Sequence, residues 1–212
     1  MNEAPIDLSS FAPASFFARA AERLHREPST AEVAGDHVLN PDLRVEGATY
    51  HDAAVLIPVV ARLPSASVLL TRRTRYLTAH AGQIAFPGGK VEPADAGPAA
   101  AALREAREEI GLDPAAVEVI GYLDPYLTRT GFRITPVLGR IEPGQRYTLN
   151  RDEVEEIFEV PLAFLMTPAN HRRAARVFMG RERYFYEIAF EGRSIWGATA
   201  GIIRELYERM FG

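Results

Sequence analysis

Short apolar runs, separated by turns that contain Pro, Gly or Ser, recur along the chain and predict β-strands. The expected strands cover residues 53–60, 67–71, 84–86, 117–123, 134–141, 154–160 and 184–190. Apolar residues at helical spacing predict helices at 12–24, 98–110, 162–166 and 198–210. Because strands outnumber helices and the helices lie far apart in sequence, we expect an α/β fold. A mixed sheet between a few helices is favoured over a doubly wound parallel sheet.

The beginning of the chain differs from the rest. Residues 12–24 have one apolar face, which indicates an amphipathic helix packed on or beside the main domain. This face consists of Phe16, Phe17, Ala20 and Leu24. Residues 27–42 mix polar residues with Pro and Gly without a period, and this pattern predicts a connection rather than a core element. We therefore expect an N-terminal helical extension with a linker in residues 1–50, and the main domain in residues 51–212.

The composition of the 212-residue chain is that of an ordinary globular protein. Its net charge of −4 argues against a broad nucleic-acid surface. No apolar run reaches the roughly 18 residues that a membrane span needs, so no membrane partner is expected. Residues 1–10 lack the basic and apolar regions of a secretory signal, which favours the cytoplasm. Because the chain has no cysteine, its chemistry must come from carboxylates, imidazoles or hydroxyls.

The helix expected at 98–110 carries a dense group of acidic residues. Glu105, Glu108 and Glu109 stand at i, i+3 and i+4, a spacing that predicts a compact, solvent-facing triangle of carboxylates. Like charges this close repel, and a divalent cation such as Mg²⁺ or Mn²⁺ would relieve the repulsion. Arg104 precedes Glu108 by four residues and is expected to pair with it. The alternative is a Glu-rich helix face that is simply solvated.

Other residues define the ends and the buried face of this helix, and others could form a ligand site beside it. Pro98 and Gly111 are typical of a helix start and end. The inward stripe of the helix is expected to consist of Leu103, Ala106 and Ile110. Gly88 and Gly89 follow a strand, and such a pair lets the backbone approach a ligand closely, although most pairs are only turns. Two basic clusters could meet phosphate or be solvated surface charge: Arg72, Arg73 and Arg75, then Arg172, Arg173 and Arg176.

Gly89, Asp95 and the run from Arg104 to Leu112 together resemble the Nudix box, G-x5-E-x7-R-E-U-x-E-E-x-G-U, where U is aliphatic. The run reads Arg-Glu-Ala-Arg-Glu-Glu-Ile-Gly-Leu, and its arginine, three glutamates and glycine have the family's spacing. Asp95 stands where the box has its first glutamate, and eight residues instead of seven separate it from Arg104. Ala106 is small for an aliphatic position.

A second signature resembles the coenzyme A pyrophosphatase branch of the Nudix family, which shares the aspartate and the extra residue. Leu69-Leu70-Thr71-Arg72-Arg73-Thr74 opens this signature, and Gly82 followed by Phe86-Pro87-Gly88-Gly89 closes it. Thr74 and Thr78 replace a small residue and an arginine of the pattern. Residues 153–162 and 196–201 also look like this branch, so the resemblance covers about residues 53–206.

The resemblance implies a Nudix-type α/β/α sandwich around a mixed β-sheet. The implied reaction is metal-dependent hydrolysis of coenzyme A, with its derivatives left open, to 3',5'-adenosine bisphosphate and 4'-phosphopantetheine. The implied ligands of Mg²⁺ or Mn²⁺ are Glu105, Glu108, Glu109 and the Gly89 carbonyl. Further catalytic candidates are Arg104 and Glu153, and the substrate-binding candidates are Arg73, Gly88, Gly89 and Arg75, the last in place of the missing arginine. The expected partner is this small molecule, and a homodimer is left open.

Other interpretations stay open at this point. Another nucleoside diphosphate derivative, such as ADP-ribose or a dinucleotide, could be the substrate, although the second signature speaks against it. A non-catalytic Nudix-like binding module would lack metal carboxylates, whereas all three helix glutamates are present. We interpret His80 as a structural residue of a glycine-containing loop and Trp196 as a core anchor. Ser194 and Thr199 lack the partners of a nucleophilic triad.

Overall fold

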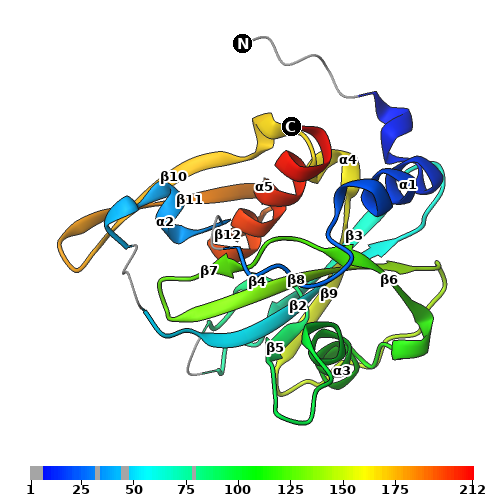
Figure 1. Cartoon of the computed structure of the whole chain (residues 1–212), viewed down its shortest axis with the longest axis horizontal. Helices are drawn as coiled ribbons and strands as arrows, with labels where there is room; N and C mark the ends of the chain where they lie inside the picture. The colour runs from blue at the N-terminus through cyan, green and yellow to red at the C-terminus, as the bar shows by residue number, and fades with distance from the viewer. Residues whose placement is uncertain (1–6, 32–33, 44–47, 78–79) are drawn as a thin grey trace.

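The computed structural model describes residues 7–31, 34–43, 48–77 and 80–212, and its centre is a mixed β-sheet (Figure 1). Within these residues, nine strands belong to this sheet. They are β1 (Ala34–Gly35), β2 (His51–Val60), β3 (Ser67–Arg73), β4 (Ile84–Ala85), β5 (Gly88–Lys90), β6 (Val117–Tyr122), β7 (Tyr126–Leu127), β8 (Phe132–Ile141) and β9 (Val154–Pro161). Six follow the order β1-β7-β8-β2-β3-β4, while β5 pairs with β2, β6 with β8 and β9 with β3. Strands β2 and β8 run parallel, whereas β3 is antiparallel to both β2 and β9.

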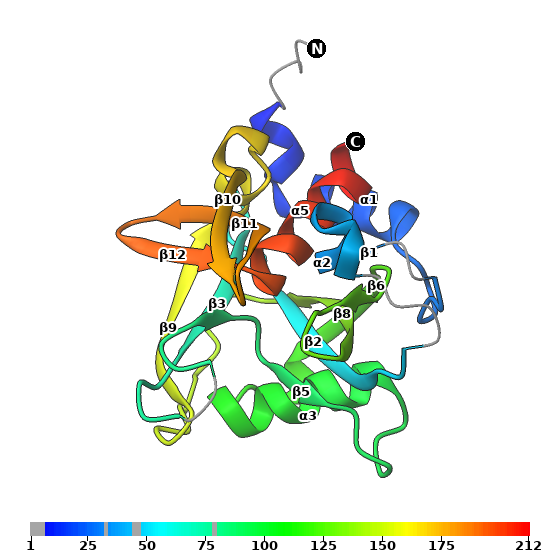
Figure 2. The same cartoon turned by 90° about the vertical axis from the view of Figure 1, so that its left-hand side faces the viewer.

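Helices cover both faces of this sheet (Figure 2). They are α1 (Pro13–Arg23), α2 (Asp36–Leu39), α3 (Pro98–Ile110), α4 (Leu162–Leu165) and α5 (Ala198–Phe211), with 3₁₀ helices η1 (Leu8–Phe11), η2 (Pro41–Leu43), η3 (Pro114–Ala116) and η4 (Pro168–Asn170). Successive side chains of a strand point to opposite faces. In β2, Leu56 and Val60 are therefore buried with α3, whereas Ile57 and Val59 are buried on the face of α1 and α5. The expected sandwich around a mixed sheet is confirmed.

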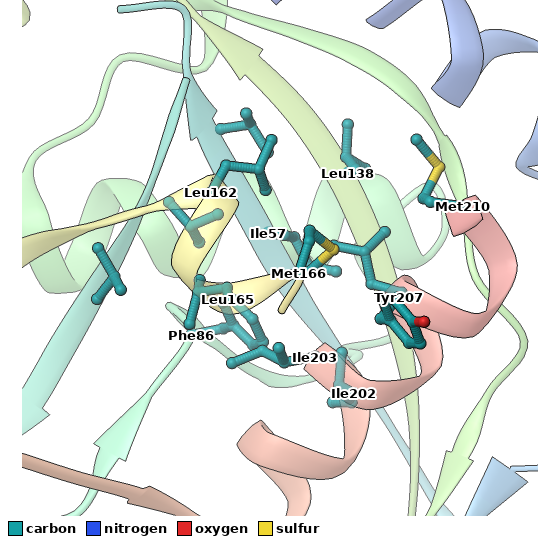
Figure 3. Packing of buried hydrophobic residues seen from close by; sticks show 14 of the residues in the cluster. Ile57, Phe86, Leu138, Leu162, Leu165, Met166, Ile202, Ile203, Tyr207 and Met210 are labelled. Carbon is teal, nitrogen blue, oxygen red and sulfur yellow. The ribbon is translucent and has the colours of Figure 1, made fainter. Parts of the chain in front are cut away.

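The layer on the α5 face is the larger of the two hydrophobic layers. Ile57 of β2 and Leu138 of β8, labelled in Figure 3, belong to the same hydrophobic cluster as Ile203 and Met210 of α5. Burial of one such side chain stabilises the fold by roughly 1.5–3 kcal/mol. Ile203 is only 1% exposed, so truncation to alanine would leave a cavity and lower the free energy of unfolding by about 2–5 kcal/mol.

The N-terminal helix packs as its apolar face predicts. Phe16 and Ala20 of α1 are fully buried, in the same cluster as Met210. The connection expected at 27–42 is more structured than its sequence indicates, because it contains β1, α2 and the start of η2. Strand β1 pairs parallel with β7, and Ala34 is buried in the core. Two residues that pair with a distant segment leave no periodic signal, so the local pattern could not predict this strand.

A second sheet of three antiparallel strands lies beside α5. It contains β10 (Arg172–Phe178), β11 (Arg181–Phe190) and β12 (Arg193–Trp196), and the β10–β11 hairpin projects from the body in Figure 1. Only residues 184–190 of this sheet were expected as strand. Most side chains of β10 are exposed, so the strand lacks the apolar alternation that would predict it. No helix in the described part of the chain is long and apolar enough to cross a membrane.

Candidate active site

Two glycines let strand β5 lie directly against helix α3. Strand β5 pairs antiparallel with β2, with Gly88 opposite Val55 and Gly89 opposite Ala54. A Cβ on Gly88 would collide with the Ala54 carbonyl oxygen, and a Cβ on Gly89 would collide with the Glu105 carboxylate. A side chain at Gly88 would meet backbone that cannot give way, whereas one at Gly89 would require the Glu105 side chain to move. The backbone of β5 therefore contacts the acidic side of α3.

Glu109 is the most buried of the three helix glutamates. Its residue is 3% exposed, and its Oε2 accepts a 3.3 Å hydrogen bond from the Gly88 amide. The Arg73 guanidinium on β3 approaches from the other side, with Nη1 3.6 Å from Oε1. Burial, joined by the charges of Glu105 and Glu153, raises the pKa of Glu109 to about 8, although Arg73 and Gly88 act to lower it. A low-dielectric setting and neighbouring carboxylates thus make the ionised form of Glu109 unfavourable unless positive charge is added.

Arg104 connects the loop before α3 to the helix glutamates. Its Nε and Nη2 bind both carboxylate oxygens of Asp95 at 3.1 Å, and Nη2 also donates to the Lys90 carbonyl at 3.1 Å. Its Nη1 donates to Glu105 at 3.0 Å and to Glu108 at 3.2 Å, which confirms the expected pair with Glu108. The guanidinium lowers the pKa of Asp95. For Glu105, burial outweighs Arg104, and its pKa is raised.

The prediction of one solvent-facing triangle of glutamates is wrong. The side chains of Glu105, Glu108 and Glu109 are 18%, 57% and 4% exposed, so only Glu108 faces solvent freely. Across the residues that the structure describes, no three acidic or imidazole side chains converge as a metal cluster. The buried face of α3 consists of Ala101, Ala102, Ala106, Glu109 and Ile110, while Leu103 is only half-buried. Glu109 thus belongs to the apolar side of the helix, not to the polar side.

Glu153 reaches the same region from the loop before β9. Its charge acts to raise the pKa of both Glu105 and Glu109. The Asn150 side-chain amide donates to Glu153 Oε1 at 3.3 Å, and the Asn150 backbone amide donates to the Glu109 carbonyl at 2.9 Å. Asn150 therefore ties this loop to the end of α3. No motif in the sequence indicated this residue.

The three arginines of the first basic cluster have different surroundings. Arg73 faces Glu109, and its buried Nε has no hydrogen-bond partner among the described residues. Arg72 pairs instead with Glu156, 3.2 Å away. Arg75 lies in the turn after β3, with its Cγ 4.0 Å from where a Cβ of Gly82 would stand. Thr78, the position of the missing arginine, lies outside the described residues.

The remaining candidates lie elsewhere. His80 has a positive φ of 59° and a 2.8 Å hydrogen bond between its Nδ1 and Gln83. Trp196 is half-buried at the end of β12 and is not a core anchor. The Arg176 guanidinium lies 5.0 Å from the centre of its ring. The second basic cluster is on β10, where Arg173 covers the Tyr184 ring at 4.1 Å. Arg173 and Arg176 contact aromatic rings of their own sheet, whereas Arg172 pairs with Glu187 at 3.4 Å.

Comparison with known proteins identifies the family. Residues 49–180 match the NUDIX domain. The chain belongs to the Nudix family. The uncharacterized Nudix hydrolase NudL of Escherichia coli strain K12 is 45% identical over 169 residues, which cover 80% of this chain and 88% of NudL. NudL of Shigella boydii serotype 4 has the same identity and coverage. The crystal structure of DR0079 from Deinococcus radiodurans has a TM-score of 0.50, 13% identity and coverage of 79% of this chain and 88% of that one, a likeness in fold alone.

As a Nudix hydrolase, the protein acts on the phosphoric anhydride bond of a nucleoside diphosphate derivative and uses divalent metal ions. The residues present fit such an ion by their chemistry. Glu105 and Glu109 offer carboxylate oxygens with raised pKa values, and the Gly89 backbone lies against Glu105. Oxygen donors of this kind are the ligands that Mg²⁺ and Mn²⁺ prefer. A cation at this place would also offset the mutual repulsion of the carboxylates.

Proposed function

We propose that this Nudix hydrolase cleaves the diphosphate of coenzyme A, with its derivatives left open, to 3',5'-adenosine bisphosphate and 4'-phosphopantetheine. The main support is Arg73, which belongs to the signature that resembles the coenzyme A pyrophosphatase branch. Its guanidinium lies beside Glu109 and carries a buried Nε without a partner. A planar guanidinium with free donors suits a phosphate oxygen better than an ammonium does.

Mg²⁺ or Mn²⁺ is the proposed cofactor, held by Glu105, Glu109 and the Gly89 carbonyl. Glu108 is a further ligand in this proposal, although its carboxylate is exposed and paired with Arg104. When bound, such a cation neutralises charge on the phosphoryl oxygens and lowers the pKa of a water molecule. Glu109 and Glu105 bind as carboxylates, so loading of the site requires that both lose their protons.

The surrounding residues orient these groups. Arg104 is proposed as a positioning residue, because its contacts with Asp95 and Glu105 fix the side chain of Glu105 in the loop–helix junction. Glu153 is proposed as the proton acceptor or a further ligand, held by Asn150 at 3.3 Å. Gly88 and Gly89 keep the strand close enough for the diphosphate to meet α3. Arg75 is proposed to contact an anionic part of the substrate where the branch has its arginine.

Residues 51–212 are the proposed catalytic domain, and residues 1–50 the N-terminal extension, whose helix α1 packs on it. We propose that the protein acts in the cytoplasm and that its partner is the small-molecule substrate. A homodimer is included as a hypothesis that sedimentation velocity tests directly. A single monomeric species over the working concentration range would remove it.

A hydrolysis screen tests the substrate. The protein is incubated with Mg²⁺ or Mn²⁺ and coenzyme A, ADP-ribose, NADH or diadenosine polyphosphates, and the products are separated by chromatography. We expect coenzyme A to give both named products with the highest kcat/KM. A higher kcat/KM for ADP-ribose or a dinucleotide would reject coenzyme A and keep the Nudix hydrolase. Glu109→Gln serves as the inactive control for contaminating phosphatases.

A further inference from the structure

A cavity of about 380 Å³ lies between the N-terminal extension, β7, β11 and α5. Its lining residues Leu123 and Tyr126 belong to the hydrophobic layer on the α5 face of the sheet, opposite to α3. A volume of this size is typical of sites for small organic molecules. The cavity is therefore separate from the acidic site on α3 and beyond the proposed function.

One wall of the cavity is built by a chain of specific contacts. The Tyr126 ring lies against Gly201 of α5, where any Cβ would collide with it. The Tyr126 hydroxyl donates to Asp36 Oδ1 at 2.9 Å, and Asp36 Oδ2 accepts from the Arg129 amide at 2.8 Å. These contacts fix α2, β7 and α5 relative to one another. One wall of the cavity is consequently built from three elements that contact one another directly.

Glu205 is the unsatisfied group of this cavity. Its Oε2 is buried and has no hydrogen-bond partner among the described residues. Burial, joined by the charges of Asp124 and Glu208, raises the pKa of Glu205 to about 8, although Arg209 acts to lower it. Buried polar atoms in folded proteins are nearly always hydrogen-bonded, so an exception that lines a cavity indicates a missing donor.

The other charged groups of the cavity already have partners. Asp124 accepts from His25 at 3.0 Å, and Glu208 pairs with Arg204 at 2.7 Å. Arg209 donates from its Nε to the Arg23 carbonyl at 2.6 Å, and its Nη2 lies 3.3 Å from His25 Nε2. Glu205 is left as the acceptor without a donor, in a field that its acidic neighbours make negative. A cationic donor complements this environment, whereas an anion would not.

We propose that this cavity binds a small primary ammonium compound with an apolar body, whose ammonium group donates to the Glu205 carboxylate. The apolar body is inferred from Val38, Leu39 and Leu123, which line the same space. A divalent metal ion is the weaker interpretation, because one free carboxylate supplies too few of the oxygen ligands that such ions require. The ligand would also bridge α2 of the extension to α5 of the domain.

Isothermal titration calorimetry of the full chain with n-pentylamine tests the proposal, in an amine-free buffer at pH 9, where the Glu205 carboxyl is ionised and the amine is still protonated. The matched probe is 1-pentanol, which has the same alkyl chain and no charge. We expect saturable binding of the amine and at least about tenfold weaker binding of the alcohol, since the charge-assisted hydrogen bond is lost. Equal affinities for the two probes, or no saturable heat with either, would overturn the proposal.

Two variants locate the bound amine. Glu205→Gln should weaken amine binding by about tenfold or more, whereas Glu208→Gln, an exposed neighbour on the same helix, should change it by less than about threefold. Val38→Trp places a large side chain at the cavity and should also reduce binding. Amine affinity that is unchanged in both Glu205→Gln and Val38→Trp would overturn the assignment. Coenzyme A hydrolysis by Glu205→Gln should equal that of the native chain, so failure here is distinct from failure of the proposed function.

Discussion

The burial of Glu205 should make the stability of the ligand-free protein depend on pH. Its pKa in the folded protein is about 8, against an ordinary 4.5. A carboxyl with a raised pKa stabilises the fold fully below pH 4.5, and this contribution is lost as the pH rises through about 8. The interval between the two values corresponds to a loss on the order of 5 kcal/mol. Glu205→Gln keeps the shape of the side chain and cannot ionise, so the variant should escape this loss.

We therefore expect native protein and Glu205→Gln to melt within about 2 °C of each other at pH 5. At pH 9 the variant should melt at least about 5 °C higher, because a protein of this size gains roughly 2–4 °C per kcal/mol. The assay is circular dichroism in amine-free buffers with a metal chelator. Glu208→Gln is the matched control, since its carboxylate is 56% exposed and should show no comparable gain at alkaline pH.

The melting temperatures of the native protein and of Glu205→Gln, compared from pH 5 to pH 9, show whether the pKa of Glu205 is raised. Parallel profiles from pH 5 to pH 9 would mean that Glu205 is ionised and solvated in the folded protein. In that case the cavity would be open to water at Glu205, and the reasoning from its burial would fail. A gain that is the same in Glu208→Gln would instead indicate a general charge effect on α5.

Three further predictions concern the candidate active site. Glu109→Gln should lower kcat by about a hundredfold or more while circular dichroism shows a native fold; near-native turnover at saturating Mg²⁺ would remove Glu109 from the metal site. Arg73→Ala should raise the KM for coenzyme A by about tenfold. The control is Arg72→Ala, which should raise it less because the Arg72 guanidinium pairs with Glu156; equal increases in KM would contradict the proposed contact of Arg73 with phosphate. Arg75→Ala should raise the same KM, and adding Thr78→Arg should restore much of it. Strictly additive effects in steady-state kinetics would contradict that coupling.

The sequence predicted best where local signals were strong. Helix α3 has the expected bounds, because Pro98 and Gly111 mark its ends and Gly111 adopts the left-handed conformation at φ 67°. The orientation of this helix was harder to predict. Three alanines on its buried face let α3 approach the sheet closely, and Glu109 is carried inward beside them. A hydrophobicity pattern assigns glutamate to solvent and therefore misses a buried carboxylate that tertiary contacts stabilise.

Features assembled from distant segments left no trace in the sequence. Strand β1 and the cavity around Glu205 depend on contacts between residues 34–39, 123–126 and 201–209, each unremarkable by itself. Asn150 is similar, because its contact with Glu153 depends on how the loop folds back on α3. Local patterns describe which face of an element is apolar. They do not describe which elements meet.

The contacts of Arg104 have a consequence for how the loop before α3 can change in length. Asp95 is held by the guanidinium of Arg104 as well as by the Glu92 amide, at 2.8 Å. An inserted residue between Asp95 and Arg104 can therefore bulge outward while both ends of the ion pair stay in place. Lengthening a flexible loop by one residue changes its closure entropy only slightly. This segment should accept another glycine after Ala96 with little change in melting temperature.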